Sequence, residues 1–178
     1  KEASKEIWNE LISLPGKVRS DIGNASEGNS EIYLDGTFYI IRKSKLVKKA
    51  EQLHGVLLLG FDVYKQSPDI TYKLLDDDNY DLSILYETTW QDRPVYVVGA
   101  HEGDLESKQF WIDKERLIFV RQIGKSPSNS LVEIQFYNYL PFEQGWMATE
   151  VIFIRNEDKF IHEQYLDYKI LENIDPKV

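Results

Sequence analysis

The second half of the chain is a succession of strand-like segments, and this succession limits the fold more than any other feature. From Leu82 onward, runs of about seven to eleven residues, rich in β-branched and aromatic side chains, are joined by short polar connections, among them a turn at Gln91-Asp92. A parallel βαβ unit needs a crossover of a dozen or more residues, which these connections do not provide. The sequence therefore predicts an antiparallel meander, with about nine or ten strands in the whole chain.

The first 45 residues contain two local signals. Residues 4–14 place apolar side chains at helical spacing and run into Pro15-Gly16, which predicts an N-terminal amphipathic helix. Asp35-Gly36 lies between two β-rich runs, a typical two-residue hairpin turn. We therefore expect a helix, followed by a hairpin centred on Asp35.

Two helices are predicted in the middle of the chain. Between Leu46 and Tyr64 the apolar residues lose their alternation, which indicates a mostly buried helix. Ser67 is a good N-cap and is followed by Pro68 and an acidic residue, so a short helix should run from there to about Asp77. We interpret residues 44–81 as a helical lid or plug inserted into one domain that spans residues 1–178.

Composition excludes several classes of function. The formal net charge of −9 disfavours nucleic acid and anionic membrane surfaces, since both require a basic footprint. The chain has no Cys, which removes disulfides, thiolate metal sites and Cys nucleophiles. No apolar run approaches the roughly 18 residues of a membrane span. The chain begins at Lys1 rather than Met, and we leave open a leader or lipid anchor ahead of it.

Many strands are apolar on both faces, which a sheet with one solvated face does not require. In the stretch FWIDKERLIFV, a four-residue charged turn at 113–116 would pair Ile112 with Leu117. That register sends Trp111 and Ile118 to one face and Phe110 to the other. A sheet with two apolar faces must curl around an interior or pack in layers.

No pattern supports catalysis or a resident metal. HEGDLE at 101–106 and DDDNYD at 76–81 contain potential ligands, but a solvated loop and a helix end explain them better than zinc or calcium. No nucleophile elbow, phosphate-binding loop or HExxH motif is present. We expect neither enzymatic activity nor a cofactor.

The second half of the chain resembles a known family. VYVVGAHEGDLESKQFWIDKERLIFVRQI, EIQFYNYLPFEQGWMATEVIFI and the final YLDYKI follow the strand pattern of bacterial lipoprotein-localisation (LolA/LolB-like) proteins, as does GNSEIYLDGTFYII at 28–41. The likeness is clearest over residues 93–172 and includes no catalytic motif. It implies an α+β, mainly antiparallel fold: a curved half-open β-barrel of about 10–11 strands, with helices covering or plugging its concave face.

The resemblance implies a periplasmic or envelope protein that binds a hydrophobic ligand, such as an acyl chain or a lipoprotein, in sorting to the outer membrane. An alternative is a sensor or protein-interaction domain of the same fold, with its interior filled by its own helices and an envelope protein as its partner. A more distant alternative is a hydrolase that uses buried carboxylates. We expect a monomer. The residues predicted to line the cavity are Phe38, Ile40, Leu57, Leu58, Phe61, Tyr96, Val98, Trp111, Ile118 and Val120.

Overall fold

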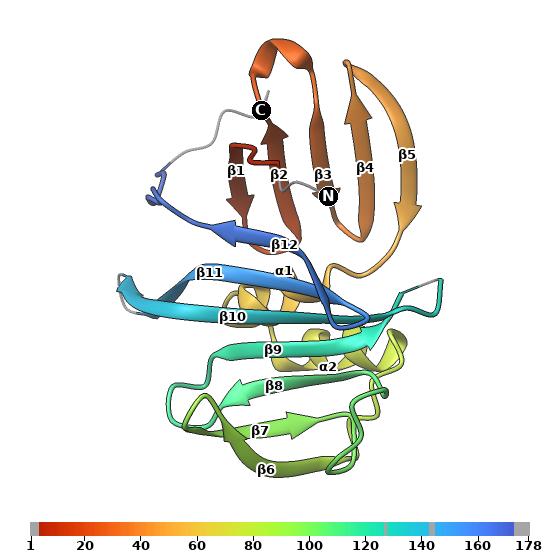
Figure 1. The fold of residues 1–178 in the computed structure, drawn as a ribbon, viewed down its shortest axis with the longest axis vertical. Helices are drawn as coiled ribbons and strands as arrows, with labels where there is room; N and C mark the ends of the chain where they lie inside the picture. Colours follow the sequence, from red (N-terminus) through yellow and green to blue (C-terminus); the bar gives the residue numbers. More distant parts are fainter. Residues whose placement is uncertain (1–3, 127, 143–144, 173–178) are drawn as a thin grey trace. The chain divides into compact units, whose positions relative to one another are not determined.

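The structure is a computed structural model, which describes residues 4–126, 128–142 and 145–172 (Figure 1). The chain divides into two compact units, residues 1–79 and 80–178, and each unit is described by itself. That the two units act as one domain stays a prediction.

A five-stranded antiparallel sheet forms most of the first unit, with its strands in the order of the sequence (Figure 1). Its strands are β1 (Trp8–Ser13), β2 (Lys17–Ile22), β3 (Ser30–Leu34), β4 (Thr37–Arg42) and β5 (Lys45–Glu51). A short 3-10 helix, η1 (Ala25–Glu27), connects β2 to β3. The predicted Asp35-Gly36 turn is confirmed, because Leu34 pairs with Thr37 across it and Asp35 and Gly36 both have positive φ.

The predicted N-terminal helix is wrong. The segment instead contains β1, which pairs with β2 from Trp8 opposite Ile22 to Ser13 opposite Lys17. The Pro15-Gly16 signal marks a turn between two strands rather than the end of a helix. A helix this short is marginal by itself, and six paired residues with a neighbouring strand outweigh its weak local preference.

The first unit ends with three helices: α1 (Gly55–Gly60), the 3-10 helix η2 (Asp62–Tyr64) and α2 (Pro68–Asp77). The prediction for α2 is confirmed to the residue at its start, where the Ser67 hydroxyl accepts from the Ile70 N–H. The prediction of one helix from Leu46 to Tyr64 is wrong in its first part, because β5 occupies that part as a strand paired with β4.

Two polar side chains hold the α1–η2 segment within the first unit. His54 caps α1 by accepting from the Leu57 N–H at 3.2 Å, and its ring stacks on Phe38. Burial lowers the pKa of His54 to about 4, so this cap is a neutral imidazole at neutral pH. The buried carboxylate of Asp62 accepts from the Gly16 N–H at 3.0 Å, which ties η2 to the β1–β2 turn.

The second unit is a seven-stranded antiparallel meander, again in the order of the sequence (Figure 1). Its strands are β6 (Leu85–Trp90), β7 (Arg93–Val98), β8 (Gln109–Asp113), β9 (Phe119–Lys125), β10 (Leu131–Phe142), β11 (Gly145–Arg155) and β12 (Asp158–Gln164). Gln91 and Asp92 both have positive φ and form the expected two-residue turn between β6 and β7. The predicted meander is confirmed.

The charged turn between β8 and β9 is confirmed, but the register predicted from it is wrong. Ile112 pairs with Phe119 rather than Leu117, and a bulge then places Trp111 opposite Arg121. The bulge makes Val120 the extra residue of β9. Trp111 and Ile118 still share one apolar cluster, as the predicted face division requires.

The fold is therefore α+β and mainly antiparallel, as predicted. Each sheet is open, because its two end strands have one neighbour apiece, so neither sheet closes into a barrel within the described residues. Among those residues, no helix has the length and apolar content needed to cross a membrane.

Candidate functional site

A pocket opens in the second unit where β10 leaves β9. The two strands pair only from Leu131 to Gln135 of β10, whereas β10 continues to pair with β11 as far as Phe142. Asn138 lies in this departing stretch with a positive φ of 53°. Two contacts still reach back to the start of β9: the Tyr139 hydroxyl donates to the Phe119 carbonyl, and the Phe136 ring packs on the Phe119 ring. The departure leaves a half-open space next to the start of β9.

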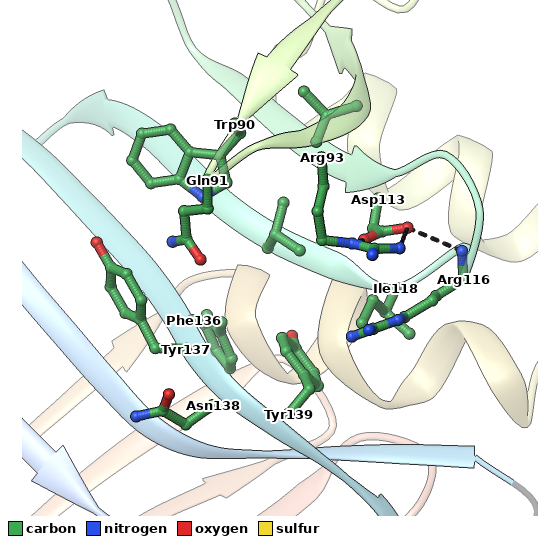
Figure 2. Close-up of a pocket in the computed structure, with 12 residues that line it drawn as sticks. Trp90, Gln91, Arg93, Asp113, Arg116, Ile118, Phe136, Tyr137, Asn138 and Tyr139 are labelled. Carbon is green, nitrogen blue, oxygen red and sulfur yellow. Dashed lines mark hydrogen bonds and ion pairs between the residues drawn. The ribbon is translucent and has the colours of Figure 1, made fainter.

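The pocket is half open to solvent, and its cavity volume is about 90 Å³. That volume is below the range of roughly 300–1,000 Å³ typical of small-molecule sites, so a ligand would lie only partly inside the pocket. Figure 2 shows its lining, which combines aromatic and aliphatic side chains with a few polar ones. The lining residues are Trp90, Gln91, Arg93, Val95, Asp113, Arg116, Ile118, Val120, Phe136, Tyr137, Asn138 and Tyr139.

A buried ion pair forms the polar corner of the pocket. Asp113 is only 2% exposed, and its carboxylate faces the guanidinium of Arg93, which donates to both carboxylate oxygens (Figure 2). Asp113 also accepts from the backbone N–H groups of Glu115 and Arg116, at 3.0 and 2.8 Å. Burial raises the pKa of Asp113, but these donors outweigh burial and hold the pKa below its usual value. Asp113 is therefore ionised and shapes the charged turn.

Trp90 forms another wall of the pocket and is held in place by a buried cation. The guanidinium of Arg121 contacts two indole rings, 4.3 Å from the Trp90 ring centre and 4.4 Å from that of Trp111, and the two rings also contact each other edge-to-face at 5.7 Å. The Arg121 side chain is 10% exposed and donates to Glu133 at 2.5 Å. The Trp111 N–H in turn donates to Gln109 at 2.9 Å. These contacts fix the orientation of Trp90 by charge and ring packing together.

A chain of hydrogen bonds continues from this ion pair to the pocket. Gln135 donates to Glu133, and the Tyr137 hydroxyl donates to Gln135. Burial raises the pKa of Tyr137, and the charge of Glu133 raises it further. Tyr137 is therefore a neutral donor committed to Gln135, and it supplies the pocket with an aromatic ring rather than an acid or base.

The lining suits binding better than covalent chemistry. Asp113 is the only carboxylate among the described lining residues, and Arg93 already occupies it. A nucleophile activated by an adjacent base requires a Ser, Cys, Thr or Lys beside a base, and the lining contains none of these four residue types. Within the described part of the chain, no cluster of three His, Asp or Glu side chains could hold a metal ion. The arrangement offers apolar surface, one neutralised ion pair and a second arginine.

The residues predicted to line a cavity divide between the two units. Trp111, Ile118 and Val120 come together in one buried cluster with Val95 and Val97, and two of the three, Ile118 and Val120, line the pocket. Tyr96 and Val98 alternate with Val95 and Val97 along β7 and so point to the opposite face of the sheet. In the first unit, Phe38 and Ile40 lie on β4, Leu57 and Leu58 are buried in α1, and Phe61 follows α1. That these residues line a cavity stays a prediction.

The sequence interpretation missed the polar part of the site. It treated the 113–116 turn as solvated, but Asp113 is buried because Arg93 reaches it from the neighbouring strand β7. Arg93 and Asp113 are separated by 20 residues, and neither has a local motif. The one available signal was an arginine placed directly after the Gln91-Asp92 turn, where β7 begins beside the end of β8.

Comparisons with known proteins give one structural likeness. No family model matches the chain, and no curated protein matches its sequence. Among solved structures, the chain is similar to a proposed outer membrane lipoprotein-sorting protein domain from Vibrio parahaemolyticus, at 10% identity and a TM-score of 0.44. The match covers 90% of this chain and 79% of the other. The neighbour is the kind of protein that the sequence resembles.

Proposed function

We propose that this protein binds a hydrophobic ligand, an acyl chain that is free or attached to a lipoprotein, in the pocket beside β10. The observation that carries the proposal is the departure of β10 from β9, beside which Ile118, Val120 and Phe136, each exposed by 8% or less, line a half-open space. Burial of each CH₂ group of an acyl chain contributes about 0.8 kcal/mol, so such a lining needs few polar contacts to bind. The pocket walls are held by the Arg93–Asp113 pair and by the contact of Arg121 with Trp90, which favours a preformed site.

The setting we propose is the bacterial periplasm or envelope, with a role in sorting lipoproteins to the outer membrane. The support for this setting is the sequence resemblance over residues 93–172. The protein would act without catalysis or a cofactor, holding its ligand until a partner or membrane receives it.

A second candidate is a sensor or protein-interaction domain whose interior is filled by its own helices. The observation that favours it is the burial of α1, where Leu57, Leu58 and Leu59 are exposed by 3% or less. In that case the pocket would stay empty of lipid and the ligand would be a protein segment.

Binding of a fluorescent fatty acid, together with native mass spectrometry after gentle purification, separates the two candidates. The first expects a co-purifying lipid mass and saturable probe binding. Ile118→Phe adds bulk inside the pocket and should weaken probe binding about tenfold, a change of about 1.4 kcal/mol. Ile112→Phe is the matched control, because Ile112 lies on the face of β8 opposite Trp111 and does not line the pocket. A clean apo mass with no probe binding would rule out the first candidate.

A further inference from the structure

The charges of the pocket differ in sign from the charge of the chain. Two arginines and one aspartate line it, whereas the whole protein carries a formal charge of −9. Arg93 forms ion pairs with Asp113 and with Glu115, whose carboxylate lies 2.8 Å from the Arg93 guanidinium. Arg116 has no such partner. Among the described residues, its guanidinium forms no ion pair.

Arg116 is nevertheless held in a defined position at the pocket. Its backbone N–H donates to Asp113, and its guanidinium stacks on the Trp146 ring at 4.3 Å from the ring centre (Figure 2 shows Arg116 beside Ile118). Its side chain is half-buried. Stacking occupies the flat face of a guanidinium and leaves the N–H groups in its plane available for bidentate hydrogen bonds. Arg116 is thus a positioned cation whose guanidinium donors have no partner among the described residues.

A second unused donor lines the same pocket. The indole N–H of Trp90 is buried and has no hydrogen-bond partner among the described residues. A buried polar group without a partner destabilises the folded state. Trp90 and Arg116 are both donors, and the carboxylate of Asp113 is already occupied by Arg93. A ligand that brings a negatively charged acceptor would therefore supply a partner that these donors lack among the described residues.

We propose that the pocket selects an amphiphile with one acyl chain and an anionic head, a carboxylate or a phosphate. This inference rests on the function proposed above and adds the class of ligand and its orientation. The head binds Arg116 at the rim, and the chain lies along Ile118, Val120 and Phe136. A cavity of about 90 Å³ has no room for the two chains of a phospholipid and takes only part of a single chain, the rest of which would lie along the open side of the pocket.

The test compares three ligands with the same sixteen-carbon chain on the full-length protein, by displacement of a fluorescent fatty acid below each ligand's critical micelle concentration. Palmitate carries a carboxylate, palmitoyl lysophosphatidylglycerol carries a phosphate, and monopalmitoylglycerol is neutral. We expect at least one anionic ligand to bind about tenfold tighter than the neutral one, with an affinity that falls as salt is added. Which of the two anions binds tighter distinguishes the carboxylate from the phosphate.

Two variants assign the effect to Arg116. Arg116→Gln should lower anionic affinity to the level of the neutral ligand and leave the neutral affinity unchanged. Lys114→Gln is the matched control: it removes a neighbouring cation that pairs with Glu87 and does not line the pocket, and it should change neither affinity.

The possible outcomes distinguish selection of an anionic head group from binding of an acyl chain. If all three ligands bind equally, or if Arg116→Gln leaves the preference for anionic ligands intact, the proposed selection of an anionic head group by Arg116 is refuted. The proposed binding of an acyl chain is not affected by that result. If none of the three binds the wild-type protein, acyl-chain binding is refuted as well.

Discussion

Replacement of Arg121 by alanine is the most direct test of what holds the pocket wall in place. Arg121 contacts the rings of both Trp90 and Trp111 and pairs with Glu133, with its side chain 10% exposed. The variant removes the cation, both stacking contacts and the partner of Glu133 together. Loss of stability and movement of the Trp90 wall should therefore occur in the same variant.

The expected cost follows from these contacts. Removing one partner of a buried ion pair typically costs 3–5 kcal/mol, because the other charge is left buried and unpaired. The Glu133 side chain is 17% exposed and keeps Gln135 as a donor, so its charge is not left fully unpaired in the variant. We therefore expect loss of the ion pair to cost about 2–3 kcal/mol, at or just below the lower end of that range. Two desolvated cation–π contacts add about 1 kcal/mol each. We expect Arg121→Ala to lower the free energy of unfolding by about 4 kcal/mol, a large part of the 5–15 kcal/mol of a typical protein.

Urea denaturation followed by circular dichroism measures this loss, and tryptophan emission of the native state reports the environment of Trp90 and Trp111. Arg155→Ala is the matched control, since Arg155 stacks on Phe160 at the same 4.3 Å but on an exposed surface. It should cost less than about 1 kcal/mol. The double variant Arg121→Met, Glu133→Gln should recover most of the stability, because it replaces the buried charges by groups of similar size. Equal losses for Arg121→Ala and Arg155→Ala would refute the reasoning.

Three further predictions concern single residues. Gly99→Ala should destabilise by more than about 2 kcal/mol, because Gly99 has a φ of 104° and an added Cβ would collide with the Lys108 carbonyl; an unchanged melting temperature would contradict this. In the folded protein the pKa of Asp113 lies below its ordinary value of about 4, so the ionised carboxylate stabilises the protein at pH values above that ordinary value. This stabilisation is lost as the pH falls through the folded pKa. Asp113→Asn should cost about 2 kcal/mol at pH 7 and less at pH 2, as measured by urea denaturation; a cost independent of pH would count against the ion pair. Ser67→Ala removes the hydroxyl that accepts from the Ile70 N–H and should cost about 1 kcal/mol in the same assay, whereas no loss would show that the cap is dispensable.

The parts of the fold that were predicted correctly are those whose signals are local. Ser67-Pro68 starts α2 because a cap and a proline act on the first turn of the same helix. The Asp35-Gly36 and Gln91-Asp92 turns follow from side chains that tolerate positive φ. The N-terminal segment failed for the opposite reason: its apolar spacing fits a helix, but pairing with β2 decides its conformation.

From the sequence, only apolar residues of the candidate site could be proposed. Trp111, Ile118 and Val120 were expected to line a cavity; Ile118 and Val120 lie beside the pocket, and their role in binding a ligand stays a prediction. Arg93 and Arg116 were not expected, because nothing in the residues around them indicates a partner. A face assignment along β7 also requires knowing the register with β8, and strand periodicity alone leaves both faces equally apolar.

The sequence by itself determined the strands of the second unit, their antiparallel order and the turns between them, because strand length, short connections and turn residues act within a few residues of one another. Only the tertiary structure decided where the sheet opens and what lines the opening. The bulge in β9 shifts its register by one residue, and β10 leaves β9 after Gln135. The register of β7 with β8 brings Arg93 to Asp113, 20 residues away, and Arg121 of β9 contacts both Trp90 and Trp111, since contacts between strands depend on register rather than on neighbours in the chain.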